Sequence, residues 1–229
     1  MQPSPGNTIW VVVAAYNEAR VIAAVIGDLL RAGYQVVVVD DGSRDATARV
    51  AAQAGAAVVK HPVNLGQGAG LQTGIEFALR EGADIIVTFD GDGQHRVSDI
   101  PRLIDALNAQ RADFVLGSRF LGGAVNQPPS RRLMLHAATW FTRLTTGLRI
   151  TDTHNGLRAM TRRGASSICL RQNRMAHASE ILHQVAESRL KYVEAPVTIE
   201  YSAYSLSKGQ TLGDSLMILT DLFARRLQR

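Results

Sequence analysis

The sequence of 229 residues contains one cysteine, Cys169. A lone cysteine allows no internal disulfide and no cysteine-based zinc site, so we expect a buried, inert thiol in a protein that stays in the reducing cytosol. The chain also lacks an uncharged apolar run of the roughly 18 residues that a membrane-spanning helix needs. Its first residues have neither the basic nor the apolar region of a signal peptide. Any membrane contact is therefore expected to be peripheral, on the cytoplasmic face.

Acidic residues are missing from one long stretch, since no Asp or Glu stands between residues 114 and 151. The same stretch holds the arginines Arg119, Arg131, Arg132, Arg143 and Arg149. With 25 Lys and Arg against 20 Asp and Glu in the whole chain, this predicts an anionic partner. Few aromatic residues interleave with the basic ones, which argues against nucleic acid. A phosphorylated ligand or an anionic membrane surface fits better.

Glycine is missing where a dinucleotide-binding domain needs it. In that fold, glycines in the first strand-to-helix turn let the backbone approach a pyrophosphate. Here the turn is residues 14–18, Ala-Ala-Tyr-Asn-Glu, with a bulky aromatic residue and an acid. The glycine-rich segment 64–70 follows the third expected strand instead. The sequence therefore argues against a nicotinamide-dependent oxidoreductase.

Apolar runs alternate with amphipathic segments, and 46% of the residues are hydrophobic, which predicts one α/β domain. Strands are expected at 9–15, 35–40, 56–60, 85–89 and 113–117, and helices at 18–32, 44–54, 67–81 and 98–109. Such an order indicates a mostly parallel sheet covered on both faces. Ser43 is the expected cap of the second helix, and Pro101 is expected in the first turn of the fourth. After Arg119 we expect a loop at 121–130, a helix at 131–148, a strand at 157–160, helices at 163–170 and 178–188, and a strand at 192–196.

Acidic and polar residues follow three of these strands where each one ends. The segment 90–95, Asp-Gly-Asp-Gly-Gln-His, follows the fourth strand, and the segments 40–43 and 14–18 follow the second and first. Ligands of open parallel sheets bind at the carboxyl ends of the strands, so these segments predict one crevice. Asp90 and Asp92 offer the oxygen ligands that suit Mg²⁺ or Mn²⁺ holding a diphosphate.

Other interpretations of this acidic pair fit less well. An aspartyl-phosphate phosphatase carries its nucleophilic Asp after the first strand, with Thr or Val in the place of Gln94. An EF-hand loop needs Gly in the place of His95 and Glu in the place of Pro101. Solvated turn residues would leave the companion segments unexplained.

Taken together, the segments resemble family 2 glycosyltransferases of the GT-A fold, especially the polyprenyl-phosphate (dolichol-phosphate mannose synthase-like) branch. The matching segments are 14–18, 40–43, 64–68, 90–95, Gly-Ser-Arg at 117–119, Asp-Thr-His-Asn-Gly-Leu-Arg at 152–158 and Tyr-Ser-Leu-Ser-Lys-Gly at 204–209. The resemblance implies a Rossmann-like three-layer sandwich with a mostly parallel central sheet. It also implies one catalytic domain at 1–210 and an amphipathic, basic helix at 211–229.

The resemblance implies roles for the matched residues. The nucleotide would contact Ala14, Tyr16, Glu18, Asp41, Gly66, Gly68, Gly91, Asp92 and Lys208. The metal would lie among Asp90, Asp92 and Gln94. The sequence departs from the family at Ala14, where proline is usual, and at Ser202, where this branch commonly has an arginine. The acceptor phosphate would therefore be held by Arg119 with Arg131, Arg132 or Arg158.

The implied reaction is a metal-dependent, inverting transfer from a UDP- or GDP-sugar to a membrane polyprenyl phosphate. A lipid phosphate is already anionic, so it needs positive charge more than a general base. Asp152 is expected to act with Arg119 in catalysis, either as the base or as an orienting group. His154 is expected to be a polar pocket residue.

The sequence leaves three alternative functions open, and it does not decide between a membrane surface and a small membrane subunit as the partner. The acceptor could instead be a saccharide of a growing polysaccharide, or the chain could be a non-catalytic scaffold that binds a sugar nucleotide. A nucleotidyltransferase on a related fold is the third, but it would need a Gly- and Lys/Arg-rich first loop to grip a triphosphate, and this chain has none there. The helices at 131–148 and 212–229 suit a membrane surface or a small membrane subunit, although core packing explains the apolar stripe of 212–229 equally well. A homo-oligomer is compatible with the sequence.

Overall fold

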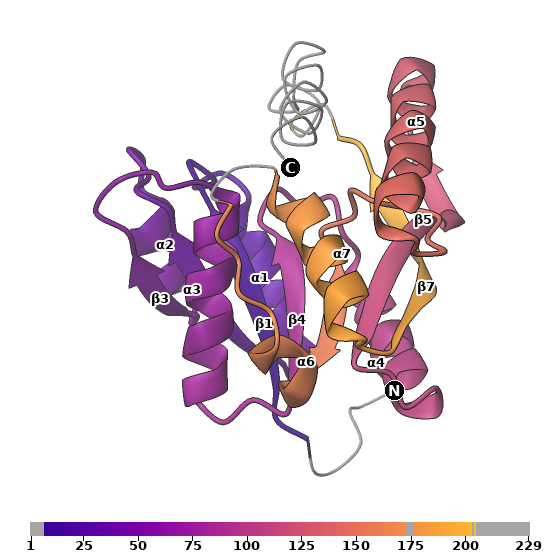
Figure 1. The fold of residues 1–229 in the computed structure, drawn as a ribbon. Coiled ribbons are helices and arrows are strands. Elements are labelled where there is room, and N and C mark those ends of the chain that lie inside the picture. The colour runs from indigo at the N-terminus through magenta and orange to yellow at the C-terminus, as the bar shows by residue number, and fades with distance from the viewer. Residues whose placement is uncertain (1–6, 173–175, 203, 205–229) are drawn as a thin grey trace.

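A seven-stranded sheet forms the centre of the computed structural model, which describes residues 7–172, 176–202 and 204 (Figure 1). The strands are β1 (Ile9–Ala15), β2 (Gln35–Asp40), β3 (Ala57–Lys60), β4 (Ile85–Asp90), β5 (Phe114–Val125), β6 (Arg158–Thr161) and β7 (Tyr192–Glu200). They lie in the order β3-β2-β1-β4-β6-β5-β7. Of these strands, β6 alone runs antiparallel to its neighbours. The mostly parallel sheet expected from the sequence is confirmed.

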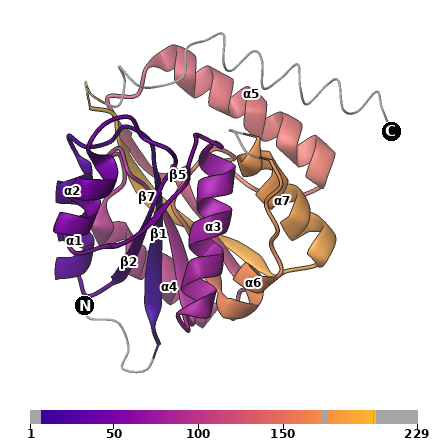
Figure 2. The ribbon, with the colours of Figure 1, turned by 90° about the vertical axis from the view of Figure 1, so that its left-hand side faces the viewer.

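Helices cover both faces of the sheet, which gives the expected three layers (Figure 2). One face carries α1 (Ile22–Arg31), α2 (Thr47–Gln53) and α4 (Ile100–Ala109), and the other carries α3 (Gln67–Arg80), α6 (Arg162–Ser166) and α7 (His177–Ser188). A 3₁₀ turn, Val97–Asp99, precedes α4, and Pro101 lies in the first turn of α4 as expected.

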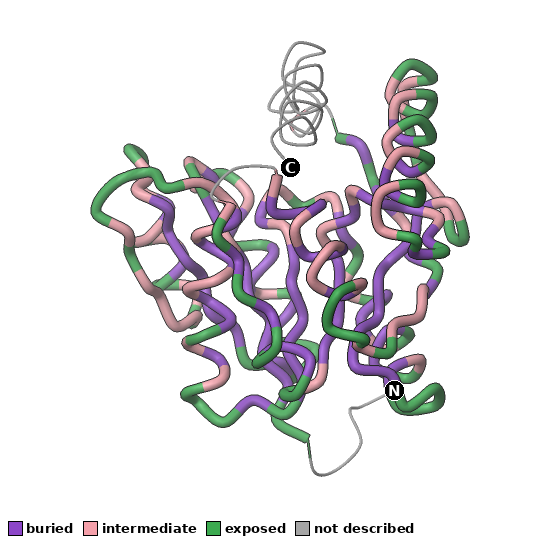
Figure 3. Tube along the Cα trace, in the orientation of Figure 1, coloured by how far each residue is buried: buried purple, intermediate pink, exposed green. Residues whose placement is uncertain are grey.

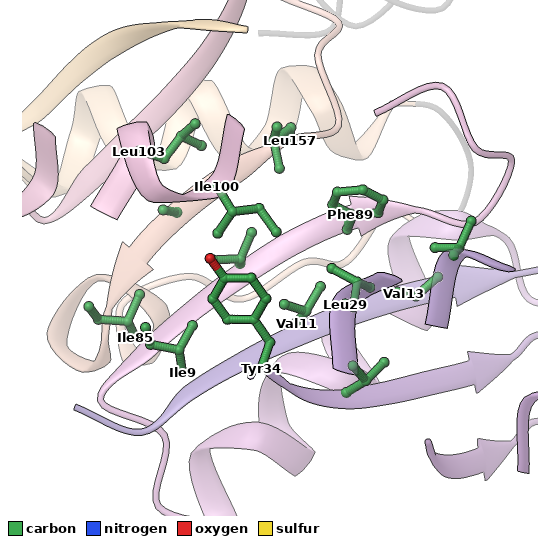
Figure 4. Close-up of a cluster of buried hydrophobic side chains, with 14 of the residues drawn as sticks. Ile9, Val11, Val13, Leu29, Tyr34, Ile85, Phe89, Ile100, Leu103 and Leu157 are labelled. Carbon is green, nitrogen blue, oxygen red and sulfur yellow. The ribbon is translucent and has the colours of Figure 1, made fainter. Parts of the chain in front are cut away.

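The hydrophobic core is divided into two clusters by the sheet. Successive side chains of a strand point to opposite faces, so Val11 packs toward α1 and α4 while Val12 packs toward α3. Figure 4 shows the first cluster, in which Val11 lies with Leu29 of α1 and Ile100 of α4. Full burial of one such side chain stabilises the fold by roughly 1.5–3 kcal/mol.

Helix α3 packs closely on β1 because two of its three glycines face that strand. A Cβ on Gly74 would lie 2.3 Å from Cγ1 of Val12, and one on Gly70 would lie 3.0 Å from Cβ of Ala14. Gly66, with a φ of 100°, turns the chain into the helix. The close packing brings the first residue of α3, Gln67, beside the end of β4.

The structure corrects the expected loop at 121–130, because β5 continues to Val125. Its second half pairs with β7 from Gly123 opposite Thr198 to Val125 opposite Glu200, after an irregularity that follows Ser118. Gly122 permits this approach, since a Cβ there would lie 2.2 Å from the carbonyl oxygen of Val197. The glycines that suggested a loop thus allow close strand contact.

Two smaller expectations were also wrong. Ser43 does not cap α2, which begins at Thr47; the Ser43 hydroxyl instead accepts a hydrogen bond from the Asn17 amide at 2.9 Å. Cys169 is exposed rather than buried, because it lies in the segment between α6 and α7 with its side chain facing solvent.

Helix α5 (Pro129–Thr146) stands at the carboxyl end of the sheet and extends beyond it (Figures 1 and 2). Its burial alternates along the helix, with Leu135, Thr139 and Thr142 buried and much of the rest exposed (Figure 3). Within the described ranges, no helix is long and apolar enough to cross a membrane.

Candidate active site at the carboxyl end of the sheet

The register of the parallel strands brings the three polar segments together. Ala14 of β1 lies opposite Asp90 of β4, and the next residue, Ala15, lies opposite Asp40 of β2. The segments that follow these residues therefore leave the sheet at the same edge. The acidic residues of the predicted crevice therefore lie where β1, β2 and β4 end.

Asp90 is held by groups on both of its oxygens. Gln67 Nε2 donates to Oδ1 at 3.0 Å, and His95 Nε2 lies 2.8 Å from Oδ2. Burial raises the pKa of Asp90, but the hydrogen bond and charge of His95 and the charge of Arg158 outweigh it, so the pKa is lowered overall. Asp90 therefore stays ionised in a fixed orientation.

The pKa of Asp92 is shifted in the opposite direction to that of Asp90. Asp92 Oδ1 accepts a hydrogen bond from the Gln94 amide at 3.0 Å. Burial and the negative charge of Asp90 raise its pKa to about 6. A carboxylate whose proton affinity is raised by a neighbouring carboxylate marks a place where a cation is stabilised. Gln94 adds a half-buried amide side chain beside them.

The donor set fits a divalent cation that keeps most of its ligands from outside the protein. In the part of the chain that the structure describes, no group of three or more His, Cys, Asp or Glu side chains is arranged to hold a metal. Asp90, Asp92 and Gln94 alone would leave coordination positions open. Mg²⁺ and Mn²⁺ sites that carry a diphosphate have this character, because phosphate oxygens and water complete the shell.

The residues expected at the nucleotide lie around this edge, with different degrees of access. Tyr16 is 40% exposed, and Gly91 is buried against Val13 and Ile22. Gly68 packs against Gln172 and His177, since a Cβ there would lie 1.9 Å from the Gln172 carbonyl oxygen and 2.9 Å from Cβ of His177. Lys208 lies outside the described residues.

Glu18 is fixed from two directions. Its amide donates to Thr47 Oγ1 at 2.8 Å, and its Oε2 accepts from the Tyr204 hydroxyl at 2.7 Å. Tyr204 also lies under the guanidinium of Arg20, 5.4 Å from the ring centroid. The segment after β7 therefore reaches back to the loop after β1.

Asp41 lies beneath the glycine-rich loop rather than open to a ribose. Its oxygens accept from the amides of Leu65 at 2.9 Å and Gly66 at 2.7 Å, and Oδ1 lies 2.8 Å from His61 Nδ1. Asp41 thereby fixes the loop that leads into α3. A shallow depression of about 310 Å³ lies next to it, lined by Asp40, Gly42, Ser43, Lys60, His61 and Pro62.

Arg119 and Asp152 form a buried ion pair at the other side of the crevice. Asp152 Oδ2 accepts from Arg119 Nε at 2.6 Å and from its amide at 3.0 Å. Burial lowers the pKa of Arg119, but the charges and hydrogen bonds of Asp152 and Tyr201 together outweigh it and raise the pKa overall. Asp152 also accepts from the His154 amide at 3.3 Å and from Asn155 Nδ2 at 3.4 Å. These bonds favour the orienting role for Asp152 over that of a base.

Three of the four arginines expected at the acceptor phosphate act on His154 through their charge. Burial and the positive charges of Arg119, Arg158 and Arg131 lower the pKa of His154 to about 4, against the opposite effect of Asp152. His154 is therefore neutral at pH 7. Arg132 is exposed on α5 and is not among the groups that act on His154.

Arg158 is buried, with 2% of its surface exposed, so its charge acts on the neighbouring side chains from inside the protein. Burial lowers its pKa to about 10, although the charges of Asp90 and Asp152 oppose this. Its Nη1 has no hydrogen-bond partner among the described residues. The structure thus places Arg158 between the two acids of the crevice instead of on the surface that a lipid phosphate would reach.

Four side chains that shape the site were not singled out from the sequence: Gln67, His61, His95 and Tyr201. His95 lies within the acidic motif and Gln67 within the glycine-rich one, so their positions in those motifs were a usable signal. His61 and Tyr201 act through contacts with residues far along the chain. No local pattern marks them.

Comparison with known proteins identifies the family. Residues 10–168 match the family described as Glycosyl transferase family 2. The chain is 30% identical over 241 residues to the UDP-N-acetylglucosamine–dolichyl-phosphate N-acetylglucosaminyltransferase of Methanococcus voltae, covering 96% of this chain and 94% of the relative. It is 31% identical over 217 residues to the polyprenol monophosphomannose synthase of Mycolicibacterium smegmatis, covering 89% of this chain and 82% of the relative.

A solved structure shares the fold. Glucosyl-3-phosphoglycerate synthase from Mycobacterium tuberculosis, in complex with Mn²⁺, UDP and glucosyl-3-phosphoglycerate, superposes with a TM-score of 0.74. At 22% identity the superposition covers 96% of this chain and 80% of that one, which shows a common GT-A fold. With the family match spanning more than half of its length, this chain belongs to family 2 of the glycosyltransferases.

Proposed function

We propose that this glycosyltransferase moves a sugar from a nucleoside-diphosphate sugar to a membrane polyprenyl phosphate, with inversion at the sugar carbon. The observation that carries the proposal is the group of arginines around a neutral His154, beside an Asp152 that is already occupied by Arg119. An anionic acceptor needs positive charge and positioning, whereas a sugar hydroxyl needs a general base. The relatives named for dolichyl-phosphate and polyprenol acceptors support the same class of acceptor.

The donor half of the crevice supports a nucleoside diphosphate. Asp90, Asp92 and Gln94 would hold Mg²⁺ or Mn²⁺, which supplies charge neutralisation at the leaving diphosphate when it is bound. Gln67 and His95 keep Asp90 oriented, and Asp41 fixes the loop in front of α3. Tyr16 offers an exposed ring to a base, and Lys208 is proposed to close over the diphosphate.

Helix α5 supports a peripheral position on the membrane, which we propose to be its cytoplasmic face. Leu133, Trp140 and Leu144 are 74%, 64% and 61% exposed, and their spacing of seven and four residues places them on one face of the helix. Arg132 and Arg143 lie exposed along one flank of that face. An apolar stripe bordered by arginines is suited to the headgroup region of anionic lipids.

The proposal is tested by transfer assays with UDP- and GDP-sugars, with Mn²⁺ or Mg²⁺, in the presence and absence of a short-chain polyprenyl phosphate. We expect metal-dependent formation of a lipid-linked sugar by the wild type and none by Asp92→Ala. Transfer to an oligosaccharide but not to the lipid would replace the acceptor. Nucleotide binding without transfer to either acceptor would favour a non-catalytic scaffold, and no nucleotide binding at all would overturn the proposal.

A further inference from the structure

The residue that follows β7, Tyr201, is held at the junction of the two halves of the crevice. The preceding amide, of Glu200, donates to the Gln94 carbonyl in the acidic motif at 2.9 Å. The amide of Tyr201 donates to the Val125 carbonyl at the end of β5 at 3.1 Å. With 2% of its surface exposed, Tyr201 is fixed by the backbone on both sides.

The phenol of Tyr201 completes the hydrogen bonding of Arg119. Arg119 Nη1 donates to the Tyr201 hydroxyl at 2.6 Å, while Nε is bound to Asp152 and Nη2 donates to the His154 carbonyl at 2.7 Å. Each nitrogen of this guanidinium thus has one partner, which fixes its plane. A fixed guanidinium presents its remaining N–H groups in one direction.

The ring of Tyr201 carries a second arginine on its face. The guanidinium carbon of Arg131, from the first turn of α5, lies 5.1 Å from the ring centroid. This distance is within the range of a cation–π contact. Arg131 Nε is buried and has no hydrogen-bond partner within the described residues, so the ring contact is the principal restraint shown for this side chain.

Two guanidinium groups close together repel one another, and a group between them must offset that repulsion. The Tyr201 hydroxyl oxygen accepts from one, and the negative face of the ring attracts the other. Neither contact neutralises a charge as a carboxylate would. The charge of Arg119 is offset by Asp152, but one N–H on each of its Nη atoms is left for an anion, as is the guanidinium of Arg131.

We propose that Tyr201 is the positioning residue of the acceptor site, which holds Arg119 and Arg131 in place to bind the phosphate of the lipid acceptor together. The proposal rests on the proposed function for the identity of the acceptor. It assigns to an aromatic side chain the task of keeping two positive charges adjacent. Substitution of Tyr201 should therefore weaken binding of the acceptor phosphate without weakening binding of the nucleotide.

The test compares Tyr201→Phe, which removes only the bond to Arg119, with Tyr201→Leu, which also removes the ring beneath Arg131. Tyr192→Phe is the matched control, because the Tyr192 hydroxyl accepts a hydrogen bond from the Arg149 amide at 2.8 Å at the other end of the same strand. The measurements are KM for a short-chain polyprenyl phosphate, kcat, nucleotide affinity, and direct binding of farnesyl phosphate by calorimetry.

Loss of a hydrogen bond to a charged group predicts a KM for the lipid phosphate about tenfold or more higher in Tyr201→Phe, and a larger rise in Tyr201→Leu. Farnesyl phosphate binding should weaken in the same order, with nucleotide affinity unchanged. A purely structural role would instead lower the melting temperature and all parameters together, and that result would overturn the inference. So would acceptor binding by Tyr201→Leu equal to that of Tyr192→Phe.

The two proposals fail in different ways. If the wild type transfers sugar to the lipid phosphate and Tyr201→Leu does so with unchanged KM, only the role of Tyr201 is wrong. If the wild type binds farnesyl phosphate in a Tyr201-dependent manner but transfers no sugar to a polyprenyl phosphate, the role of Tyr201 stands and the proposed reaction is wrong. No binding of farnesyl phosphate by the wild type overturns the inference directly.

Discussion

Gly156 packs directly against the carboxylate of Asp90, since a Cβ on Gly156 would lie 2.2 Å from Oδ2 of Asp90. The glycine lies in the segment that enters β6, next to β4, so the space for the carboxylate depends on a residue far along the chain. Gly156→Ala should push the Asp90 carboxylate away from His95. We expect metal-dependent nucleotide binding to weaken by about a hundredfold, since orientation of a ligand is lost. Calorimetry with Mn²⁺ and the nucleotide measures this affinity. An unchanged affinity would show that the Asp90 carboxylate keeps its orientation beside an alanine.

The raised pKa of Asp92 predicts how metal binding depends on pH. A cation must displace the proton that Asp92 binds below its pKa of about 6. Affinity for Mn²⁺ with the nucleotide should be nearly constant above pH 7 and fall about tenfold for each pH unit below 6. Asp92→Asn should bind weakly at every pH. A wild-type affinity that does not change between pH 7 and pH 5 would contradict the cation position.

Asp152 offers a test that separates orientation from proton transfer. Asp152→Asn keeps the shape of the side chain but removes the charge that holds Arg119. We expect kcat/KM to fall by roughly a hundredfold, mainly through KM for the acceptor, while the pH profile keeps its shape. Disappearance of the acidic limb of the profile in this variant would instead identify Asp152 as the general base.

His154 predicts a loss of stability in acid. Its pKa is about 4 in the folded protein against 6.5 for an ordinary histidine, so only the unfolded chain binds a proton between these values. Stability should be full above pH 6.5 and fall as the pH is lowered toward 4, by up to about 3 kcal/mol from this group. Other groups titrate in the same range, so the measurement is the difference in unfolding free energy between the wild type and His154→Gln. If that difference is the same at pH 7 and pH 4.5, His154 is not a buried neutral group.

The exposed stripe of α5 predicts binding to lipid surfaces. Leu133→Ser with Trp140→Ser should reduce co-sedimentation with anionic vesicles by about tenfold or more, because two large apolar side chains no longer enter the lipid. Val63→Ser is the control, since Val63 is also exposed (58%) but lies in the loop after β3. Equal binding by the double variant and the control would show that α5 does not contact the membrane.

The sheet and the place of the acidic motif could be predicted from the sequence because they depend on local patterns. Runs such as Val36 to Val39 fit a strand buried on both faces, and the carboxyl ends of parallel strands meet at one edge. The contact between Asp41 and the amides of Leu65 and Gly66 could not be predicted, since it joins segments whose approach depends on the packing of α3 on β1.

The same difference between local patterns and tertiary contacts explains why the expected loop at 121–130 was wrong. Residues 121–125 contain two glycines, which locally favour a loop, and only the pairing with β7 makes them a strand. The partners of Arg119 lie 33 and 82 residues away, at Asp152 and Tyr201. Motifs show which residue types gather at a site, whereas the tertiary structure decides which of them face a ligand and which hold the others.

The antiparallel strand β6 has a consequence for synthesis on the ribosome. One edge of β4 can pair with β1 as soon as both have emerged, but its other edge waits for β6, where Ile85 pairs with Thr161. Until then the nascent chain presents an unpaired, apolar strand edge, which is the kind of surface that chaperones cover and that aggregates when it is left open. Because Arg158 and Gly156 arrive with β6, the nascent protein closes its sheet and completes the surroundings of Asp90 in the same step.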